Sequence, residues 1–168
     1  MIATLELLDD LNFVKVAFYT VKVHGKALTE FEDFCERMSA SKKTKRQLGE
    51  LNKQIENIGK LYGALDFQFK RENFAERLPA PTYHFFDSDG EEDFGIRLYC
   101  IRLNDEAVIL LNGDLKTAKK VKDCPNCKPH FDFANALSNT IYEARQNDDI
   151  EIDGRDIFLE DDYLLDIK

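Results

Sequence analysis

The chain has 168 residues, a formal net charge of −9 and a hydrophobic content of 43%. This length and composition predict a globular domain with a substantial core and exclude a low-complexity protein. Residues 1–11 are acidic and lack a long apolar run, which excludes a secretory signal or a membrane span in this segment. With four cysteines and no export signal, we expect a cytoplasmic protein with reduced thiols and no membrane partner.

The negative charge is concentrated near the C-terminal end of the sequence. Residues 147–168 carry a net charge of −7, whereas residues 1–146 carry only −2. A nearly neutral body with local basic clusters is compatible with an RNA partner, although the overall acidity removes the usual support for one. We therefore expect a single domain over 1–146 and an acidic C-terminal extension over 147–168.

The first half of the chain predicts a strand followed by two helices. Residues 12–23 are rich in β-branched and aromatic side chains, which favours a strand. Apolar residues recur at three- and four-residue steps over 28–38 and again over 48–62, the spacing of two amphipathic helices. Residues 65–76 are expected to finish the second helix or to form an irregular connection.

The second half predicts three strands and a last helix. Pro79 and Pro81 stop any helix, because proline lacks a backbone donor and restricts the residue before it. Strands are expected at 82–86, 94–103 and 107–111, with an acidic turn over 87–93, and helical spacing returns over 131–145. The predicted fold class is therefore α+β, with an N-terminal strand, two helices, an antiparallel three-stranded meander and a C-terminal helix.

The hairpin over 93–120 carries a family resemblance. An Arg97-x-Tyr99 strand, a turn, an apolar strand ending in Gly113, and then Lys116 with further lysines resemble the core of RelE/ParE-superfamily toxins. HigB-like members are the most similar, and the resemblance covers roughly 18–144. It implies a RelE-like fold and the toxin component of a type II toxin–antitoxin system. Such a toxin cleaves mRNA, often at the ribosome, and is held inactive by an antitoxin protein.

Arg97 and Lys116 are the candidate catalytic residues by this resemblance. Cleavage through a 2′-hydroxyl needs positive charge on the phosphate, for which arginine has two-pronged donors, and lysine can add charge or transfer a proton. The alternative is that Arg97 and the lysines form a solvated surface with salt bridges and have no catalytic role. No histidine is convincingly placed for acid–base work, although His84 could reach the cleft. The expected RNA-binding residues are Tyr99, through stacking, and the cations Arg102, Lys119 and Lys120.

A second constellation is Cys124-Pro-Asn-Cys127, followed by His130. Two thiolates and an imidazole could bind zinc, but a fourth ligand is not evident, so a plain loop is the main alternative. The same spacing could serve redox exchange, although the surrounding thioredoxin-like sequence is absent. For RNA cleavage we expect neither a metal nor another cofactor.

Three functions follow from these observations. The first is a metal-independent endoribonuclease toxin that acts on mRNA and binds an antitoxin. The second is a non-catalytic binding or regulatory protein on the same fold, and the third is a zinc-knuckle interaction protein. For the acidic extension, charge complementarity suggests docking over the lysines at 116–122 and 42–46, and the alternative is a solubilising tail.

Overall fold

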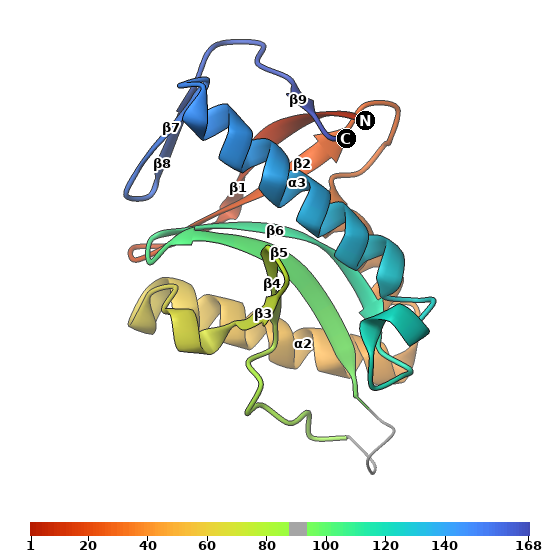
Figure 1. Ribbon diagram of the computed structural model, residues 1–168. Helices are drawn as coiled ribbons and strands as arrows, with labels where there is room; N and C mark the ends of the chain where they lie inside the picture. The colour runs from red at the N-terminus through yellow and green to blue at the C-terminus, as the bar shows by residue number, and fades with distance from the viewer. Residues whose placement is uncertain (88–93) are drawn as a thin grey trace.

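A mixed β-sheet forms the middle layer of the protein, with helices on both of its faces (Figure 1). The computed structural model describes residues 1–87 and 94–168. The strands are β1 (Ile2–Asn12), β2 (Ala17–Val23), β3 (Lys70–Glu72), β4 (Ala75–Leu78), β5 (Ile96–Asn104), β6 (Ala107–Leu115), β7 (Ile150–Asp153), β8 (Asp156–Leu159) and β9 (Leu165–Asp166). The α-helices are α1 (Glu30–Met38), α2 (Lys42–Asn57) and α3 (Lys128–Gln146). Short helical turns are η1 (Ile58–Tyr62), η2 (Asp66–Gln68) and η3 (Val121–Asp123).

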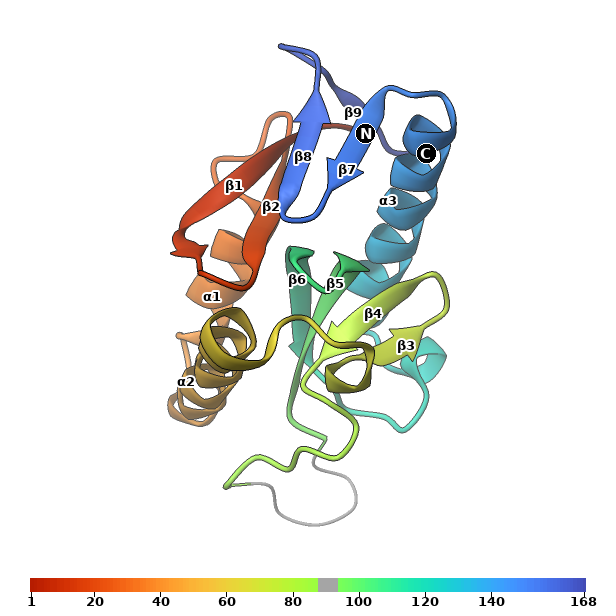
Figure 2. The ribbon, with the colours of Figure 1, turned by 90° about the vertical axis from the view of Figure 1, so that its left-hand side faces the viewer.

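The strand order of the main sheet, within the described residues, is β3-β4-β5-β6-β2-β1-β9. All neighbours in it are antiparallel except β2 and β6, which run parallel and pair only over Ala17–Tyr19 and Ala107–Ile109. Beyond Ile109, β6 therefore loses β2 as a neighbour, and α1 packs along this part of the strand. The strands β7 and β8 form a separate hairpin, which lies beside β1 and β2 in Figure 2.

Two apolar layers follow from the alternation of side chains along the central strands. Even-numbered residues of β5 and β6, such as Leu98 and Leu110, pack with Phe34, Leu51 and Ile55 of α1 and α2. Odd-numbered residues of the same strands face α3 on the other side of the sheet; the larger ones are Tyr99, Ile101, Ile109 and Leu111. Since both faces are covered, β5 and β6 read as apolar runs with little visible alternation.

Helix ends agree with local sequence signals. Thr29 caps α1 through a capping box, in which its hydroxyl accepts from the Glu32 N–H (3.2 Å) and its own N–H donates to the Glu32 carboxylate (2.8 Å). Ser41 caps α2 by accepting from the Thr44 N–H. Pro129 lies in the first turn of α3, where its missing donor costs nothing. The helices predicted over 28–38, 48–62 and 131–145 are thus present, with bounds shifted by a few residues in α1 and α3 and by more at the start of α2.

The predicted overall layout is nevertheless wrong. The protein is α+β, but a seven-stranded mixed sheet dominates the described residues, in place of one strand, a three-stranded meander and their helices in a RelE-like layout. The strand predicted at 82–86 is not formed; this segment consists of turns and extended chain. Residues 75–78 form β4 instead, before the prolines that end it. Of the predicted acidic turn, residues 88–93 lie outside the described residues.

Two further strands, β1 and β9, form in the acidic segments at the two chain ends, where no strand was predicted. The N-terminal segment forms β1, which pairs with β2 from Ala3 to Leu7 and again at Asn12. The C-terminal strand β9 then pairs with β1, so that the Met1 amino group donates to the Ile167 carbonyl at 2.7 Å. Exposed acids on an edge strand cost little and discourage pairing with other chains. The chain termini therefore meet at one edge of the sheet (Figure 1).

The acidic segment 147–168 is part of this fold and does not cover the lysine-rich exit of β6. Ile150, Leu165 and Ile167 are buried in the α3-facing core. The β7–β8 hairpin contacts the start of the chain, because Arg155 donates to the carbonyls of Phe13 and Val14. Its acids line the outside of a structural hairpin, so the hypothesis of a tail docked over 116–122 does not describe this structure.

Candidate functional site

Four cations gather on the α3-facing side of β3, β4 and β5, where the sheet approaches the start of α3. Lys70 pairs with Arg77 across β3 and β4, and Arg77 pairs with Tyr99 across β4 and β5. Arg97 precedes Tyr99 by two residues, so its side chain leaves the same face. Lys116, directly after β6, is held beside Arg97 because its N–H donates to the Gly95 carbonyl at 3.0 Å. We call Lys70, Arg77, Arg97 and Lys116 the cationic cluster.

Gly113 allows the two strands of the hairpin to approach closely at this site. A Cβ atom at position 113 would lie 1.7 Å from the Arg97 carbonyl oxygen, which no side chain can accommodate. The pairing of β5 and β6 is irregular just beyond, between Leu98 and Cys100. The glycine therefore sets the register that places Arg97 and Lys116 next to each other.

One carboxylate accompanies the cationic cluster. The Glu72 carboxylate accepts from the Arg77 Nε at 3.4 Å, while the Arg77 Nη1 donates to the Pro79 carbonyl at 2.7 Å. Arg97 donates from Nη1 to its neighbouring Ile96 carbonyl at 3.1 Å, and its buried Nε has no partner among the described residues. Lys116 lies over the Phe94 ring at 5.6 Å. Such a buried, unpaired donor is costly unless a ligand accepts from it.

The electrostatics of the cluster favour an added anion. Arg77 is 6% exposed and Lys116 is 9% exposed. Burial, and then the neighbouring Arg77, lower the pKa of Arg97 to about 10. Burial and the nearby Arg97 likewise lower the pKa of Lys116. Because these shifts arise from desolvation and like-charge repulsion, a bound phosphate would stabilise the protonated forms of both side chains.

Two residues expected to contact RNA have other contacts in the structure. Tyr99 is 1% exposed and packs edge-to-face on Phe131, so it is not available to stack on a base. Arg102 leaves the opposite face of the sheet, where it donates to the Ala64 carbonyl at 2.7 Å and pairs with Asp105. Arg97 and Arg102 are an odd number of residues apart on β5. Since side chains alternate between the two faces of a strand, the sequence alone predicts that they lie on opposite faces.

The remaining sequence candidates are exposed or are not gathered for metal binding. Lys119 and Lys120 are exposed in the segment after β6, beyond Lys116, and His84 is exposed in the 82–86 segment. In residues 1–87 and 94–168, no group of three or more His, Cys, Asp or Glu side chains is arranged to hold a metal ion. Cys124 and Cys127 lie together, but the charged groups that act on His130 belong to α1 and β6. Burial and then Arg37 lower the pKa of His130, and Asp114, Glu30 and Asp33 oppose this shift.

A polar network next to α1 completes the open edge of β6. Asn112 donates to the carboxylates of Glu30 (3.1 Å) and Asp33 (2.8 Å) and accepts from Arg37. Arg37 also donates to the Gly113 carbonyl at 2.7 Å and pairs with Asp114 at 3.0 Å. Since every member has partners within the network, we read it as structural: side chains of α1 replace the strand that β6 lacks here.

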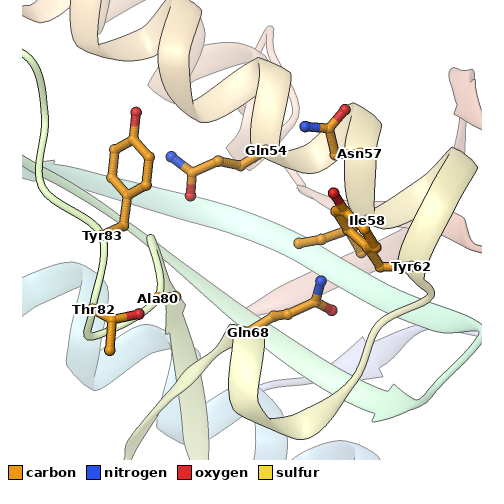
Figure 3. Close-up of a pocket in the computed structure, with 8 residues that line it drawn as sticks. All are labelled: Gln54, Asn57, Ile58, Tyr62, Gln68, Ala80, Thr82 and Tyr83. Carbon is orange, nitrogen blue, oxygen red and sulfur yellow. The ribbon is translucent and has the colours of Figure 1, made fainter.

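A separate pocket of about 240 Å³ lies at the C-terminal end of α2 (Figure 3). Gln54 and Gln68 point into it from opposite sides, and the rings of Tyr62 and Tyr83 lie at its two ends. The eight residues drawn in Figure 3 carry no formal charge, so this pocket is chemically distinct from the cationic cluster.

Three functional candidates were missed in the sequence: Lys70, Glu72 and Arg77. Lys70 and Glu72 lie in the segment 65–76, which was expected to be helical or irregular, and Arg77 directly follows it. The chain instead forms the β3–β4 hairpin there, around Asn73, whose φ is +68°. The available signal was the sequence Lys70-Arg-Glu-Asn-Phe-Ala-Glu-Arg77. Asparagine tolerates the left-handed conformation that such turns require, so a hairpin could have been considered there.

Comparisons with known proteins add no relative. No protein-family model, no curated protein and no solved structure matches this chain. Among the described residues, no helix is both long enough and apolar enough to span a bilayer.

Proposed function

We propose that the protein is a metal-independent endoribonuclease that acts on mRNA, as the toxin of a toxin–antitoxin pair. The cationic cluster is the observation that supports this function best. The toxin resemblance implies that Arg97 and Lys116 are catalytic, and these two residues are neighbours in the cluster. Arg77 and Lys70 add further positive charge. RNA supplies closely spaced phosphates, which are the anions such a cluster would neutralise.

Arg97 and Arg77 have the role of holding the scissile phosphate. The Arg97 Nε is buried without a partner among the described residues, so a phosphate oxygen placed there would gain a charge-assisted hydrogen bond. Guanidinium groups match two phosphate oxygens at once, and charge develops on those oxygens as the pentacoordinate phosphorus forms. Donors already fixed in place stabilise that charge without rearrangement.

Lys116 and Glu72 are the proton-transfer candidates. The Glu72 carboxylate would accept the proton of the 2′-hydroxyl, whose oxygen then attacks the adjacent phosphorus. The Lys116 ammonium would donate to the departing 5′-oxygen, a role that suits a lysine whose pKa is lowered by burial and by Arg97. The products are a 2′,3′-cyclic phosphate and a free 5′-hydroxyl.

The proposed partners follow from the same charges. Lys119 and Lys120 are exposed beyond Lys116 and would extend the phosphate track toward a longer RNA or a ribosome-bound message. An antitoxin would cover the cluster with acidic side chains. Their carboxylates would take the place of the RNA phosphates and neutralise the same cations. The acidic segment 147–168 cannot take this part, since it belongs to the sheet and the β7–β8 hairpin.

One observation favours a second function, a non-catalytic RNA-binding protein. Glu72 is the carboxylate that influences the pKa of Lys116, and it already accepts from Arg77. If this ion pair persisted in the RNA complex, the cluster would bind phosphate but would have no base for the 2′-hydroxyl.

Expression in a bacterial host tests the proposal. The wild type, Arg97→Ala and the matched control Arg102→Ala are induced, and growth and mRNA integrity are followed together. We expect growth arrest with mRNA loss for the wild type and Arg102→Ala, and neither for Arg97→Ala. The control removes the same charge from the opposite face of β5.

Purified protein separates the two functions. A fluorescent single-stranded RNA is incubated with the wild type and with Glu72→Gln, and binding and cleavage are measured. Cleavage abolished in Glu72→Gln with binding retained supports the endoribonuclease. Binding without cleavage in the wild type, alone and with ribosomes, would establish the second function in its place. A folded wild type that neither binds nor cleaves RNA would refute both.

A further inference from the structure

Cys124 and Cys127 bring two sulfur atoms together between the end of β6 and the start of α3. The Cys124 sulfur lies 4.0 Å from the Leu115 carbonyl oxygen, and the Cys127 sulfur lies 3.6 Å from the neighbouring Asp114 carbonyl oxygen. A turn closed by the Lys128 N–H and the Cys124 carbonyl (3.0 Å) fixes their separation. Both are free thiols.

Two hydrogen-bond donors converge on the sulfur of Cys124. The Thr117 backbone N–H lies 3.4 Å from it and the Thr117 hydroxyl 3.5 Å. Cys127 is the N-cap residue of α3, so Cys124 precedes the N-terminal, positive end of the helix dipole by three residues. The arrangement stabilises a thiolate on Cys124 and leaves Cys127 as the proton donor.

The chemistry of the two sulfurs differs accordingly. Although burial raises the pKa of Cys124, the hydrogen bonds from Thr117 and Cys127 outweigh it and bring the pKa to about 7. Burial and the adjacent Cys124 raise the pKa of Cys127 to about 12. The other two cysteines have the opposite character to Cys124, since burial raises the pKa of Cys35 to about 11 and that of Cys100 well above its usual value.

We propose that Cys124 and Cys127 form a reversible dithiol–disulfide pair that exchanges with low-molecular-weight disulfides such as oxidised glutathione. This site is independent of RNA cleavage, because it uses neither Arg97 nor Lys116. It adjoins the cationic cluster, since the Cys127 sulfur contacts the Asp114 carbonyl and Asp114 pairs with Arg97 across β5 and β6.

The exchange takes place in two steps. The Cys124 thiolate attacks one sulfur of oxidised glutathione, the glutathione S–S bond breaks, and the first glutathione leaves as a thiolate that takes up a proton. Cys127 then loses its proton and attacks the Cys124 sulfur of the mixed disulfide, which releases the second glutathione. The pair loses two electrons and two protons, and one oxidised glutathione becomes two reduced ones.

Access to Cys124 requires only a local opening. The sulfur itself is buried, but the covering residues 118–123 are exposed or half-buried and contain a single 3-10 turn, η3. A short surface segment with few buried contacts opens at a small fraction of the global unfolding free energy. Cys100, by contrast, lies in the central strand β5 and becomes accessible only when the sheet unfolds.

Glutathione trapping tests the assignment. The reduced full-length chain and its Cys127→Ser, Cys124→Ser and Cys35→Ser variants are incubated at neutral pH with oxidised glutathione. After alkylation, intact mass and peptide mapping locate every bond. The wild type and Cys35→Ser should form the 124–127 disulfide and retain no glutathione. Cys127→Ser should retain one glutathione on Cys124, and Cys124→Ser should retain none on Cys127.

Other outcomes overturn the proposal. They are a Cys127→Ser chain without an adduct, an equally fast adduct on Cys127 in Cys124→Ser, or a wild-type disulfide that involves Cys35 or Cys100. Circular dichroism confirms that each variant is folded. Should a variant not fold, the order of alkylation in the native wild type decides, and Cys124 must react first.

Discussion

Removal of Arg97 gives the sharpest test of the cationic cluster, because its effect on salt dependence can be worked out from the structure. Arg77 forms an ion pair with Glu72, whereas Lys70, Arg97 and Lys116 form no ion pair in the part of the chain that the structure describes. Three phosphates neutralised on a single strand give a slope of about −2 for log K against log salt. Affinity should then fall about 20-fold between about 50 and 200 mM salt.

Arg97→Ala should change both the slope and the affinity. The slope falls to about −1.4, and the lost charge-assisted hydrogen bonds weaken binding at low salt by about 10- to 100-fold. Fluorescence anisotropy with a short single-stranded RNA, repeated at several salt concentrations, measures both quantities. Arg102→Ala removes an equal charge from the other face and should keep the wild-type slope.

Two results would refute this reasoning. Equal slopes for Arg97→Ala and the wild type would show that Arg97 neutralises no phosphate. A slope reduced as much by Arg102→Ala would show that net charge, and not the cluster, governs binding.

The remaining predictions concern stability and thiol chemistry. Asn112→Ala should lower the free energy of unfolding by about 2–4 kcal/mol, because it leaves the buried Glu30 carboxylate and the partly exposed Arg37 with fewer partners. The exposed Asn52→Ala should cost less than about 0.5 kcal/mol. Equal urea midpoints for the two would contradict the structural network. Leu165→Ala removes a side chain that is 1% exposed and should lower the free energy of unfolding by about 2–5 kcal/mol. Deletion of 147–168 should unfold the edge of the sheet, which circular dichroism measures. An unchanged melting temperature for either variant would show that β9 does not stabilise the fold. Finally, alkylation of Cys124 should reach half its maximal rate near pH 7. Folding lowers the pKa of this thiol, so the reactive thiolate forms at a lower pH than in the unfolded chain. A midpoint near pH 9 would mean that the Thr117 and Cys127 donors do not lower the pKa of Cys124.

The helices show what local spacing can predict. Each has an apolar stripe at three- and four-residue steps, and α1 and α2 also begin at a capping residue, so the pattern depends on neighbours within four positions. The hairpin of β5 and β6 was predicted for the same reason, since its two strands are adjacent in sequence. Its consequence, that Arg97 and Lys116 lie together, was therefore also accessible from the sequence.

The rest of the cluster depended on pairing between distant segments. Lys70 and Arg77 reach Arg97 only because β4 pairs with β5, about twenty residues further along the chain. Burial of Tyr99 depends on α3, which covers one face of the sheet and places Phe131 against the ring. Alternation shows which side chains share a face, but only packing decides whether that face meets solvent or a helix.

The sequence by itself determined that the chain has enough apolar residues for a core and that its two ends are acidic, because both properties are obtained by counting residues. It could not show that these ends are strands. Residues 2–12 and 165–166 become ordered by pairing with each other and with β2, and the apolar side chains Leu165 and Ile167 find a core only under α3. Hydrogen bonds between segments more than 150 residues apart carry no local signal, so only the tertiary structure decided the edge of the sheet and, with it, the place of the acidic segment.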